Sequence, residues 1–305
     1  MAPLAKLRRA MTRFDPNGPY DVAIEDVRFA GDDAAPQLAR LYRPAGASGP
    51  WPVLVDVHGG AWSHFDRSAD MYFDRALAAC GMLVAALDFR QAPARYPAAV
   101  ADIVAGIRFI KAHAAGLGAQ PQRLGLIGGS SGGHLLLLAA LRPNAPEYTT
   151  TRYLGEGDQQ VDARVDYALP LWPIADPLAR YHYLLERLAN PRPARDRFFQ
   201  PERLRDGHDA FFGDEATMAR ASVPRLVAAG EAEHLPPLWV AHAELDENVT
   251  LAMTEALVET YRRAGGAVEL ALFAGVGHSF ANFPGPDADR CFAAMKTFIT
   301  AQLER

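Results

Sequence analysis

Short apolar runs alternate with segments of helical periodicity along most of the chain. Strands that are buried on both faces of a sheet have nearly continuous apolar runs, because neither side of such a strand meets water. An alternation of such strands with helices is typical of a mostly parallel sheet with helices on both faces. We predict strands of this sheet at residues 53–57, 82–87, 123–127, 167–171, 238–241 and 268–273.

The segments between these runs carry the spacing of helices. From Val100 to Ile107, apolar residues follow the i, i+3, i+4, i+7 pattern that places them on one stripe of a helix. Residues 135–141 are apolar all round, which is typical of a helix that is packed on every side. Two more helices are predicted at residues 251–264, where a glycine pair follows as a stop signal, and at residues 287–303.

The first 45 residues follow a different pattern. Apolar residues at 22–24 and 38–41 predict two short strands, and the Gly-Asp-Asp sequence at 31–33 favours a tight connection between them. These two strands would form an antiparallel opening to the sheet. The stretch 44–52, which is rich in proline and glycine, predicts a turn before the first core strand.

Residues 172–236 interrupt the alternation of strands and helices with repeated prolines and a cluster of aromatic and charged residues. We interpret this region as an inserted helical lid, and an ordinary long crossover connection is the alternative. The predicted domain organisation is therefore a core formed by residues 1–171 and 237–305, with the insert at residues 172–236.

Composition narrows the class of protein. The chain has 305 residues, of which 50% are hydrophobic and 22% charged, enough for a large core. A net charge of −5 provides no basic footprint for nucleic acid or an anionic membrane. No apolar run approaches the roughly 20 residues of a membrane-spanning helix, so we expect no stable membrane insertion. Residues 1–12 lack the apolar stretch of a secretory signal, and we expect a cytoplasmic enzyme.

The two cysteines, Cys80 and Cys291, lie in apolar helical segments. This placement argues against a disulfide framework and against a metal site with cysteine ligands. The chain also lacks the spacing of a histidine-based metal site. We therefore expect neither a metal nor a cofactor.

The strongest functional signal is the sequence Ile-Gly-Gly-Ser-Ser-Gly-Gly-His at residues 127–134. It places a Gly-x-Ser-x-Gly pattern between a predicted strand and an apolar helix, which is the turn that presents a serine nucleophile. Two registers fit, one with Ser130 and one with Ser131 as the nucleophile. We favour Ser130, because it lies closer to the end of the strand. Side chains two positions before and after it would then collide with the neighbouring strand and helix. A phosphate-binding loop is disfavoured, because no lysine follows.

A predicted strand is followed directly by the sequence His-Gly-Gly-Ala-Trp at residues 58–62. Two adjacent glycines at the carboxyl end of a strand can present backbone N–H groups to a developing negative charge. The amide that follows the nucleophile supplies the other donor. We therefore expect Gly59, Gly60 and Ser131 to form an oxyanion hole, and we interpret His58 as an organiser of this loop rather than a catalytic base.

A serine nucleophile requires a base within hydrogen-bond reach and an acid that orients this base. Asp246 follows a predicted strand after a short polar loop, and His278 follows the next predicted strand in the sequence Gly-Val-Gly-His. Both lie at the carboxyl ends of parallel strands, where doubly wound sheets assemble their sites. The order serine, acid, histidine is that of the α/β-hydrolases. We predict a triad of Ser130, Asp246 and His278, with Glu244 and Glu247 as alternative acids.

These motifs occur together with Leu-Asp-Phe-Arg-Gln-Ala-Pro at residues 87–93, Tyr-Pro at residues 96–97 and Asp102. The set resembles the hormone-sensitive-lipase-like branch of the α/β-hydrolases, which includes bacterial acetyl-esterase and lipase-type enzymes. The resemblance covers roughly residues 35–170 and 235–300. It implies the α/β-hydrolase fold, with an inserted lid, and a carboxylesterase that uses the triad and oxyanion donors named above.

The chain departs from the usual pattern of this branch at three positions. Ala61 stands in place of a third glycine, Gly129 in place of a common acidic residue, and Ser131 in place of the usual alanine. These changes leave the chemistry intact but leave the substrate open. The His-Gly-Gly-x-Trp form also occurs in arylformamidases and in relatives that resemble feruloyl esterases.

We therefore predict a serine carboxylesterase that hydrolyses short-to-medium acyl or aryl esters through an acyl-enzyme on Ser130. An arylformamidase-type amide hydrolase with the same triad and a non-catalytic ligand-binding protein on this scaffold are the alternatives. Trp62 and Trp172 are predicted to line the substrate pocket, and packing beneath the lid is the alternative for each. The expected partner is a small-molecule ester. The resemblance also leaves a homodimer open, because relatives often form dimers.

Overall fold

The computed structural model describes residues 14–157, 161–192 and 199–305. The expectation for the first 12 residues therefore lies outside the described residues, as does that for the part of the predicted insert at 193–198. Among the residues that are described, no helix combines the length and the apolar character that crossing a bilayer requires.

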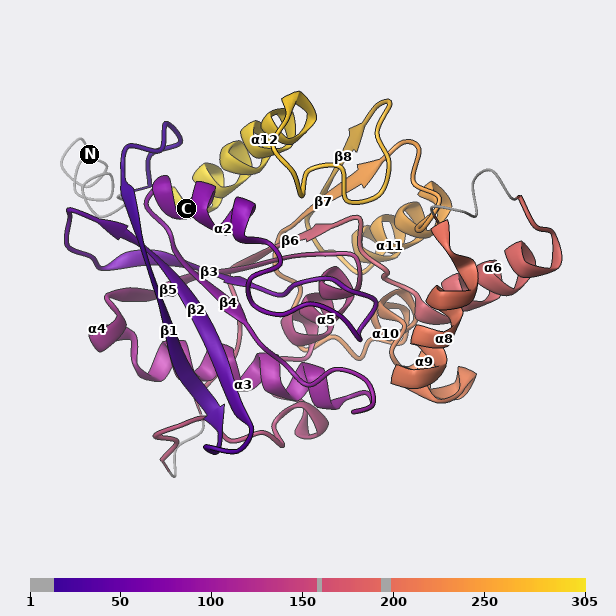
Figure 1. Cartoon of the computed structure of the whole chain (residues 1–305), viewed down its shortest axis with the longest axis horizontal. Helices are drawn as coiled ribbons and strands as arrows, with labels where there is room; N and C mark the ends of the chain where they lie inside the picture. The colour runs from indigo at the N-terminus through magenta and orange to yellow at the C-terminus, as the bar shows by residue number, and fades with distance from the viewer. Residues whose placement is uncertain (1–13, 158–160, 193–198) are drawn as a thin grey trace.

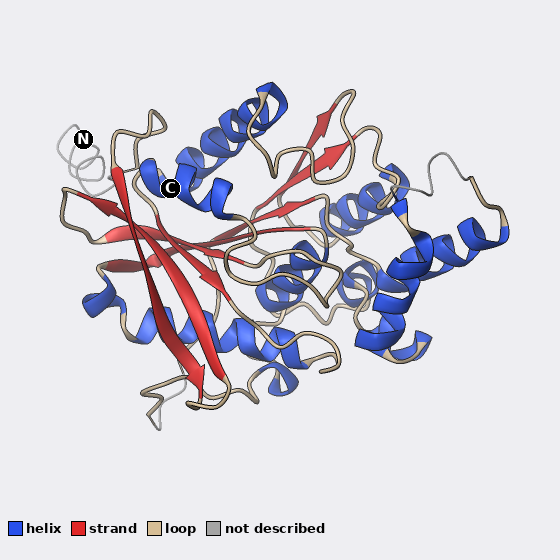
Figure 2. Ribbon diagram, in the orientation of Figure 1, coloured by secondary structure: helices blue, strands red, loops and turns tan. Residues whose placement is uncertain are grey.

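Within these ranges the chain forms an eight-stranded sheet with the order β1-β2-β4-β3-β5-β6-β7-β8. β2 pairs antiparallel with β1 and with β4, and the pairs from β4 through β8 are all parallel (Figure 2). The strands are β1 (Asp21–Gly31), β2 (Pro36–Ala45), β3 (Trp51–Asp56), β4 (Leu83–Leu87), β5 (Ala119–Gly129), β6 (Tyr167–Leu171), β7 (Leu238–Ala243) and β8 (Val268–Phe273).

Each run that the sequence predicts as a core strand lies within or overlaps one of β3 to β8, and β5 extends beyond its prediction at both ends. β1 and β2 are longer than the two short strands that we predicted. β1 is an edge strand, and most of its side chains are exposed or half-buried. Polar residues therefore interrupt its apolar pattern, which is common for edge strands. The predicted turn at 44–52 is correspondingly shorter, since β2 ends at Ala45 and β3 begins at Trp51.

Helices cover both faces of the sheet (Figure 1). α2 and α12 lie on one face, while α3, α5, α10 and α11 lie on the other. No range was predicted for α2, although Cys80 at its C-terminal end lies in a segment that we expected to be helical. The helices outside the predicted insert are α2 (Met71–Ala79), α3 (Ala98–Ala112), α4 (Ala114–Leu117), α5 (Ser131–Leu141), the short 3-10 helix η1 (Pro146–Tyr148), α11 (Leu251–Arg263) and α12 (Pro286–Leu303).

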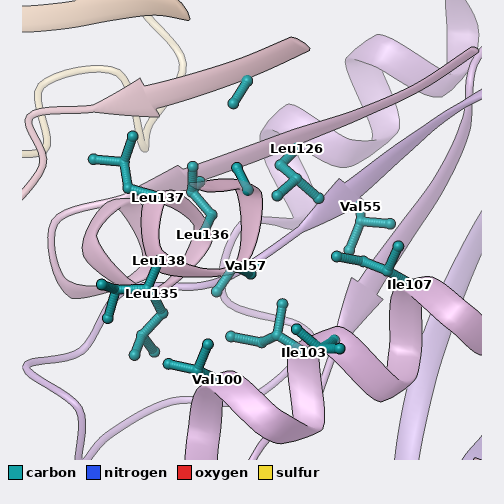
Figure 3. Packing of buried hydrophobic residues seen from close by; sticks show 14 of the residues in the cluster. Val55, Val57, Val100, Ile103, Ile107, Leu126, Leu135, Leu136, Leu137 and Leu138 are labelled. Atoms are coloured by element: carbon teal, nitrogen blue, oxygen red, sulfur yellow. The ribbon is translucent and has the colours of Figure 1, made fainter. Parts of the chain in front are cut away.

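The core beneath the site is formed by β3, β5, α3 and α5 (Figure 3). Val55 from β3 and Leu126 from β5 meet Ile103 from α3 and Leu136 from α5, and all four side chains are fully buried. Every residue of α5 is buried, which confirms the prediction of a helix that is packed all round. This packing fixes the helix that begins directly after Ser130.

The predicted insert contains α6 (Pro177–Ala189), α8 (Pro201–Phe212), α9 (Glu215–Arg220) and α10 (Val223–Ala228). Figure 1 shows α6, α8 and α9 gathered at one end of the molecule, and these three helices contact one another. α10 contacts α9 and also packs against α5 and α11. The region is helical as expected, and its role as a lid stays a prediction.

Candidate active site

Ser130 lies in a strained turn between β5 and α5. Its φ of 55° and ψ of −120° place it in a region that non-glycine residues rarely adopt. The backbone N–H of Ser130 donates to the carbonyl of Leu171 at 2.9 Å, and its carbonyl accepts from Ile174 at 3.1 Å and from His134 at 3.2 Å. These bonds hold the turn, so that the side chain of Ser130 projects at the carboxyl edge of the sheet.

The glycines on either side of Ser130 are required by close packing. A β-carbon at Gly128 would lie 2.3 Å from the carbonyl oxygen of Val57, and one at Gly132 would lie 1.9 Å from the same oxygen. This confirms the collision that the sequence analysis expected two positions before and after the nucleophile. In contrast, Ser131 is buried, and its Oγ accepts a hydrogen bond from the Trp62 amide at 3.3 Å.

The three side chains predicted as a triad meet at this edge. The Nδ1 atom of His278 lies 2.7 Å from Oδ2 of Asp246, and its Nε2 atom lies 2.9 Å from Oγ of Ser130. Because a carboxylate can only accept, Nδ1 carries a proton and donates a hydrogen bond to Asp246. Nε2 is then free to accept the hydroxyl proton of Ser130. This arrangement suits general-base activation of a serine nucleophile.

Asp246 is held as a carboxylate by its surroundings. Burial of its side chain raises its pKa, but the interactions with His278 and with two backbone amides together outweigh this effect. The backbone amides of Asn248 and Val249 also donate to Oδ1, at 2.7 and 2.9 Å. The pKa of Asp246 therefore lies below its ordinary value. An ionised Asp246 can orient the imidazole of His278 at neutral pH.

The loops that carry Asp246 and His278 are bonded to each other. The amide of Leu245 donates to the carbonyl of Val276 at 2.8 Å, and the amide of Gly275 donates to Oε2 of Glu244 at 2.8 Å. Gly275 has a φ of 74°, a conformation in which glycine is favoured. These contacts turn the loop after β8 back toward Ser130.

Of the predicted oxyanion donors, Gly59 and Gly60 line the same cavity as Ser130, and Ser131 follows Ser130 in the chain. Gly60 has a φ of 112°, and a β-carbon there would lie 2.1 Å from the carbonyl oxygen of His64. A β-carbon at Gly59 would lie 3.1 Å from the carbonyl of Gly129 and 3.6 Å from Cβ of Ser130, so the loop approaches the nucleophile closely. The amide of Ser131 opens α5, where the first N–H groups have no partner within the helix. Backbone donors in such positions can stabilise a developing oxyanion.

His58 contributes to the shape of this loop. Its ring is buried, stacks on Phe89 with a centroid separation of 4.3 Å, and donates from Nδ1 to the carbonyl of Gly59 at 2.7 Å. Burial lowers the pKa of His58, so the ring is neutral. These contacts fit the role of loop organiser that we predicted.

A cavity of about 320 Å³ opens beside Ser130 and His278. Trp172 lines it as predicted, whereas Trp62 does not. Trp62 is instead buried in an aromatic cluster with Phe211 and Phe212, and its Nε1 donates to His134. The remaining lining comes from the glycine loops, the predicted insert, the loop after β7 and the segments near α2 and α12: Gly59, Gly60, Ala61, His64, Phe65, Ala69, Asp70, Gly129, Arg180, Arg203, Leu204, Asn248, Ser279, Asn282 and Phe283.

With this geometry established, comparisons with known proteins identify the family. The BD-FAE family matches residues 40–261, which is more than half of the chain and includes Ser130 and Asp246. The chain belongs to the BD-FAE family. Membership agrees with the resemblance to hormone-sensitive-lipase-like α/β-hydrolases that the motifs indicate.

Two curated relatives from Mycobacterium tuberculosis are named as esterases or ester hydrolases. Esterase LipC is 31% identical over 82% of this chain and 58% of its own length. The probable carboxylic ester hydrolase LipM is 27% identical over 71% of this chain and 46% of its own length. The chain thus spans about half the length of the curated relatives that it matches.

A solved structure confirms the fold. Esterase 2 of Thermogutta terrifontis, phosphoramylated by tabun, has a TM-score of 0.69 and is 23% identical. The match covers 91% of this chain and 94% of that one. The α/β-hydrolase fold predicted for this BD-FAE family member is therefore confirmed.

The alternative acids of this BD-FAE family member, Glu244 and Glu247, and the nearby His134 all have other partners. Glu244 accepts from the amide of Gly275, and Glu247 pairs with Arg187 at 2.7 Å. The buried ring of His134 donates from Nε2 to the carbonyl of Ala221 at 2.8 Å, and burial lowers its pKa to about 4. His134 is therefore a neutral packing residue.

Several residues at the cavity were not found from the sequence. Arg180 and Leu204 come from the predicted insert, Phe65 follows the His-Gly-Gly-Ala-Trp segment at residues 58–62, and Phe283 follows His278. No local periodicity marks these positions as cavity residues. Asn248 had a weak signal, because it lies two residues after the predicted acid.

Proposed function

We propose that this chain is a serine carboxylesterase that hydrolyses short-to-medium acyl or aryl esters through an acyl-enzyme on Ser130. The observation that carries the proposal is the chain of hydrogen bonds from Asp246 through His278 to Ser130, at 2.7 and 2.9 Å. The named relatives are esterases, and the related structure is an esterase modified by an organophosphate, which supports the same chemistry.

The proposed reaction begins when His278 Nε2 takes the hydroxyl proton of Ser130 and Oγ attacks the ester carbonyl. The amides of Gly59, Gly60 and Ser131 stabilise the resulting oxyanion. His278 then returns the proton to the leaving alkoxide, which departs as the alcohol and leaves the acyl group on Ser130. A water molecule, deprotonated by His278, attacks this acyl group. The bond between the acyl carbon and Oγ of Ser130 then breaks, His278 returns the proton to Oγ, and the carboxylic acid is released.

The size of the cavity supports small substrates. A volume of about 320 Å³ lies at the lower end of the range for ligand sites. Trp172, Phe65 and Phe283 provide apolar surface for an acyl or aryl group. Arg180 and Leu204 extend the predicted insert into the lining. We therefore propose that residues 172–236 act as a lid that shapes the acyl or alcohol pocket.

The test is labelling of Ser130 by a fluorophosphonate, followed by mass spectrometry. The wild-type protein is expected to carry the label on Ser130, Ser130→Ala to lose it, and Ser131→Ala to keep it. Activity is then measured on p-nitrophenyl esters from acetyl to dodecanoyl, with an aryl ester and an arylformamide beside them. A folded Ser130→Ala variant with wild-type activity would remove Ser130 from the mechanism. A higher kcat/KM on the arylformamide than on every ester would favour amide hydrolysis, and an unlabelled, inactive wild-type protein would favour ligand binding.

A further inference from the structure

One face of α6 binds the loop that follows β7 and carries Asp246. Arg180, Tyr183 and Arg187 are spaced three and four residues apart, so that they lie on the same side of this helix. Tyr183 donates from its hydroxyl to the carbonyl of Glu247 at 3.1 Å, and Arg187 pairs with the carboxylate of Glu247 at 2.7 Å. Arg187 also donates to the Tyr183 hydroxyl at 2.8 Å. Three residues from the predicted insert thus converge on one short loop.

Arg180 makes the contact that lies closest to the proposed triad. Its Nε donates to the carbonyl of Asn248 at 3.1 Å, and its terminal N–H donates to Oδ1 of the same residue. The Asn248 amide in turn donates to Oδ1 of Asp246 at 2.7 Å, and Oδ2 of Asp246 accepts from His278. A continuous set of hydrogen bonds therefore joins α6 to the imidazole.

Burying the guanidinium of Arg180 costs free energy, because the charge loses its contact with water. Its side chain is fully buried, and among the described residues it forms no ion pair with a carboxylate. The guanidinium also lies 3.5 Å from Nδ1 of His208, an atom that itself lies 2.9 Å from the carbonyl of Leu204. Burial lowers the pKa of Arg180 to about 9, and the charge of Asp246 offsets this effect only in part. An apolar residue of similar size would avoid the cost of burying a charge. In return, the two hydrogen bonds that Arg180 donates to Asn248 fix both the backbone and the side chain of that residue.

We propose that Arg180 is a positioning residue for the triad: through Asn248 it holds the loop of Asp246 in the orientation that Asp246 needs to hold His278. The proposal rests on the proposed serine hydrolase function. In this arrangement the predicted insert contributes to the chemical step as well as to the cavity. A change that displaces α6 would then alter the orientation of His278 relative to Ser130, because the hydrogen bonds of Asn248 and Asp246 connect them. No contact between α6 and the reacting atoms is needed for this effect.

The test begins with Arg180→Gln, which removes the charge and the paired donors but keeps a polar side chain. We expect kcat on p-nitrophenyl acetate to fall by between about 10- and 100-fold, with little change in KM, because small displacements of catalytic groups are costly. Arg180→Lys, which keeps the charge but not the fork of donors, should recover only part of kcat. His182→Gln is the matched control, because His182 is an exposed residue of α6 that pairs with Glu215 of α9.

A double-mutant cycle separates positioning from a general effect on folding. If Arg180 acts through Asp246, Arg180→Gln should lower kcat by less than about threefold when Asp246→Asn is already present, because the two residues act as a unit. A merely structural role would give the same loss in both backgrounds. Thermal unfolding shows whether each variant is folded. Should Arg180→Gln fail to fold, Asn248→Ala and Tyr183→Phe remove single contacts of the same set and enter the same cycle.

Three results would overturn the proposal: unchanged kcat in folded Arg180→Gln, the full loss of kcat in the Asp246→Asn background, or a rise in KM alone. The last result would place Arg180 in substrate binding. An inactive wild-type protein that is not labelled at Ser130 would instead reject the proposed function, so the two failures can be told apart.

Discussion

The carbonyl oxygen of Val57 lies so close to Gly132 that a β-carbon there would come within 1.9 Å of it. The carbonyl oxygen of His58 would lie only 2.5 Å from the same carbon. The start of α5 therefore packs closely against the loop that begins at His58, which contains Gly59 and Gly60. This packing sets the distance between the Ser131 amide and the amides of the two glycines. Glycine at this position is therefore required by packing and by the geometry of the site together.

We predict that Gly132→Ala destabilises the protein by about 3 kcal/mol or more, because the displaced atoms belong to the backbone and cannot rotate away. Thermal unfolding and the yield of folded protein measure this effect. Gly116→Ala is the control, because a β-carbon there would meet nothing within 4 Å. Equal stability of the two variants would contradict the prediction.

We predict that Asp246→Asn lowers kcat on p-nitrophenyl acetate by about 10³- to 10⁴-fold. An asparagine amide at this position no longer selects the tautomer of His278 in which Nε2 accepts the Ser130 proton. Steady-state kinetics and the rate of fluorophosphonate labelling provide the measurement. Glu244→Gln is the control, since glutamine keeps an oxygen that can accept from Gly275. A larger loss in Glu244→Gln would make Glu244 the acid.

Asp70, Asp56 and Asp74 form a buried acidic cluster next to the cavity, and Asp70 lines it. Burial raises the pKa of Asp70 from 3.8 to about 6, and burial together with the charges of its neighbours raises the pKa of Asp56 and Asp74. An acid with a raised pKa binds more protons in the folded protein than in the unfolded chain. Its ionisation therefore lowers the free energy of unfolding as pH rises from about 4 to 7.

We predict that Asp70→Asn removes this loss, so that the variant is more stable than the wild-type protein above pH 6 by between about 1 and 3 kcal/mol. The difference should shrink toward pH 4. Asp70 makes no side-chain capping bond to α2, so the substitution removes charge without removing a cap. Urea denaturation at several pH values measures the effect, and the exposed variant Glu259→Gln is the control. A difference that does not vary with pH would count against the predicted titration.

Phe65 and Phe283 line the cavity with 69% and 76% of their surface exposed. We predict that Phe283→Ala, and to a similar extent Phe65→Ala, lowers kcat/KM for an octanoyl ester by about fivefold relative to an acetyl ester. The lost apolar contact is worth about 1 kcal/mol for the longer chain. Leu272→Ala is the control, because Leu272 is exposed on β8 and does not line the cavity. The same loss for both esters would show that these rings do not contact the acyl chain.

The sequence determined much of the framework that brings the proposed triad together. Apolar runs predicted the strands from β3 to β8. Every residue of β3, β4, β6 and β7 is buried, so that neither face of these strands required polar residues. The edge strand β8 was also predicted from its apolar residues, although only Phe273 in it is buried. Carboxyl ends of parallel strands meet at one edge, so the positions of Ser130, Asp246 and His278 after such strands predicted that they would meet. The structure brings these side chains within hydrogen-bond distance.

Only the tertiary structure decided what surrounds these side chains. Trp62 carried the same aromatic signal as Trp172, yet one is packed beneath the helices of the insert and the other lines the cavity. Arg180 had no signal at all, and its contact with Asn248 joins residues 68 positions apart. Periodicity reports which face of an element is buried, and it carries no information about which distant element covers that face. The cavity and the α6 contact depend on how the helices of residues 172–236 fold against the edge of the sheet, which is set by packing between segments far apart in the chain.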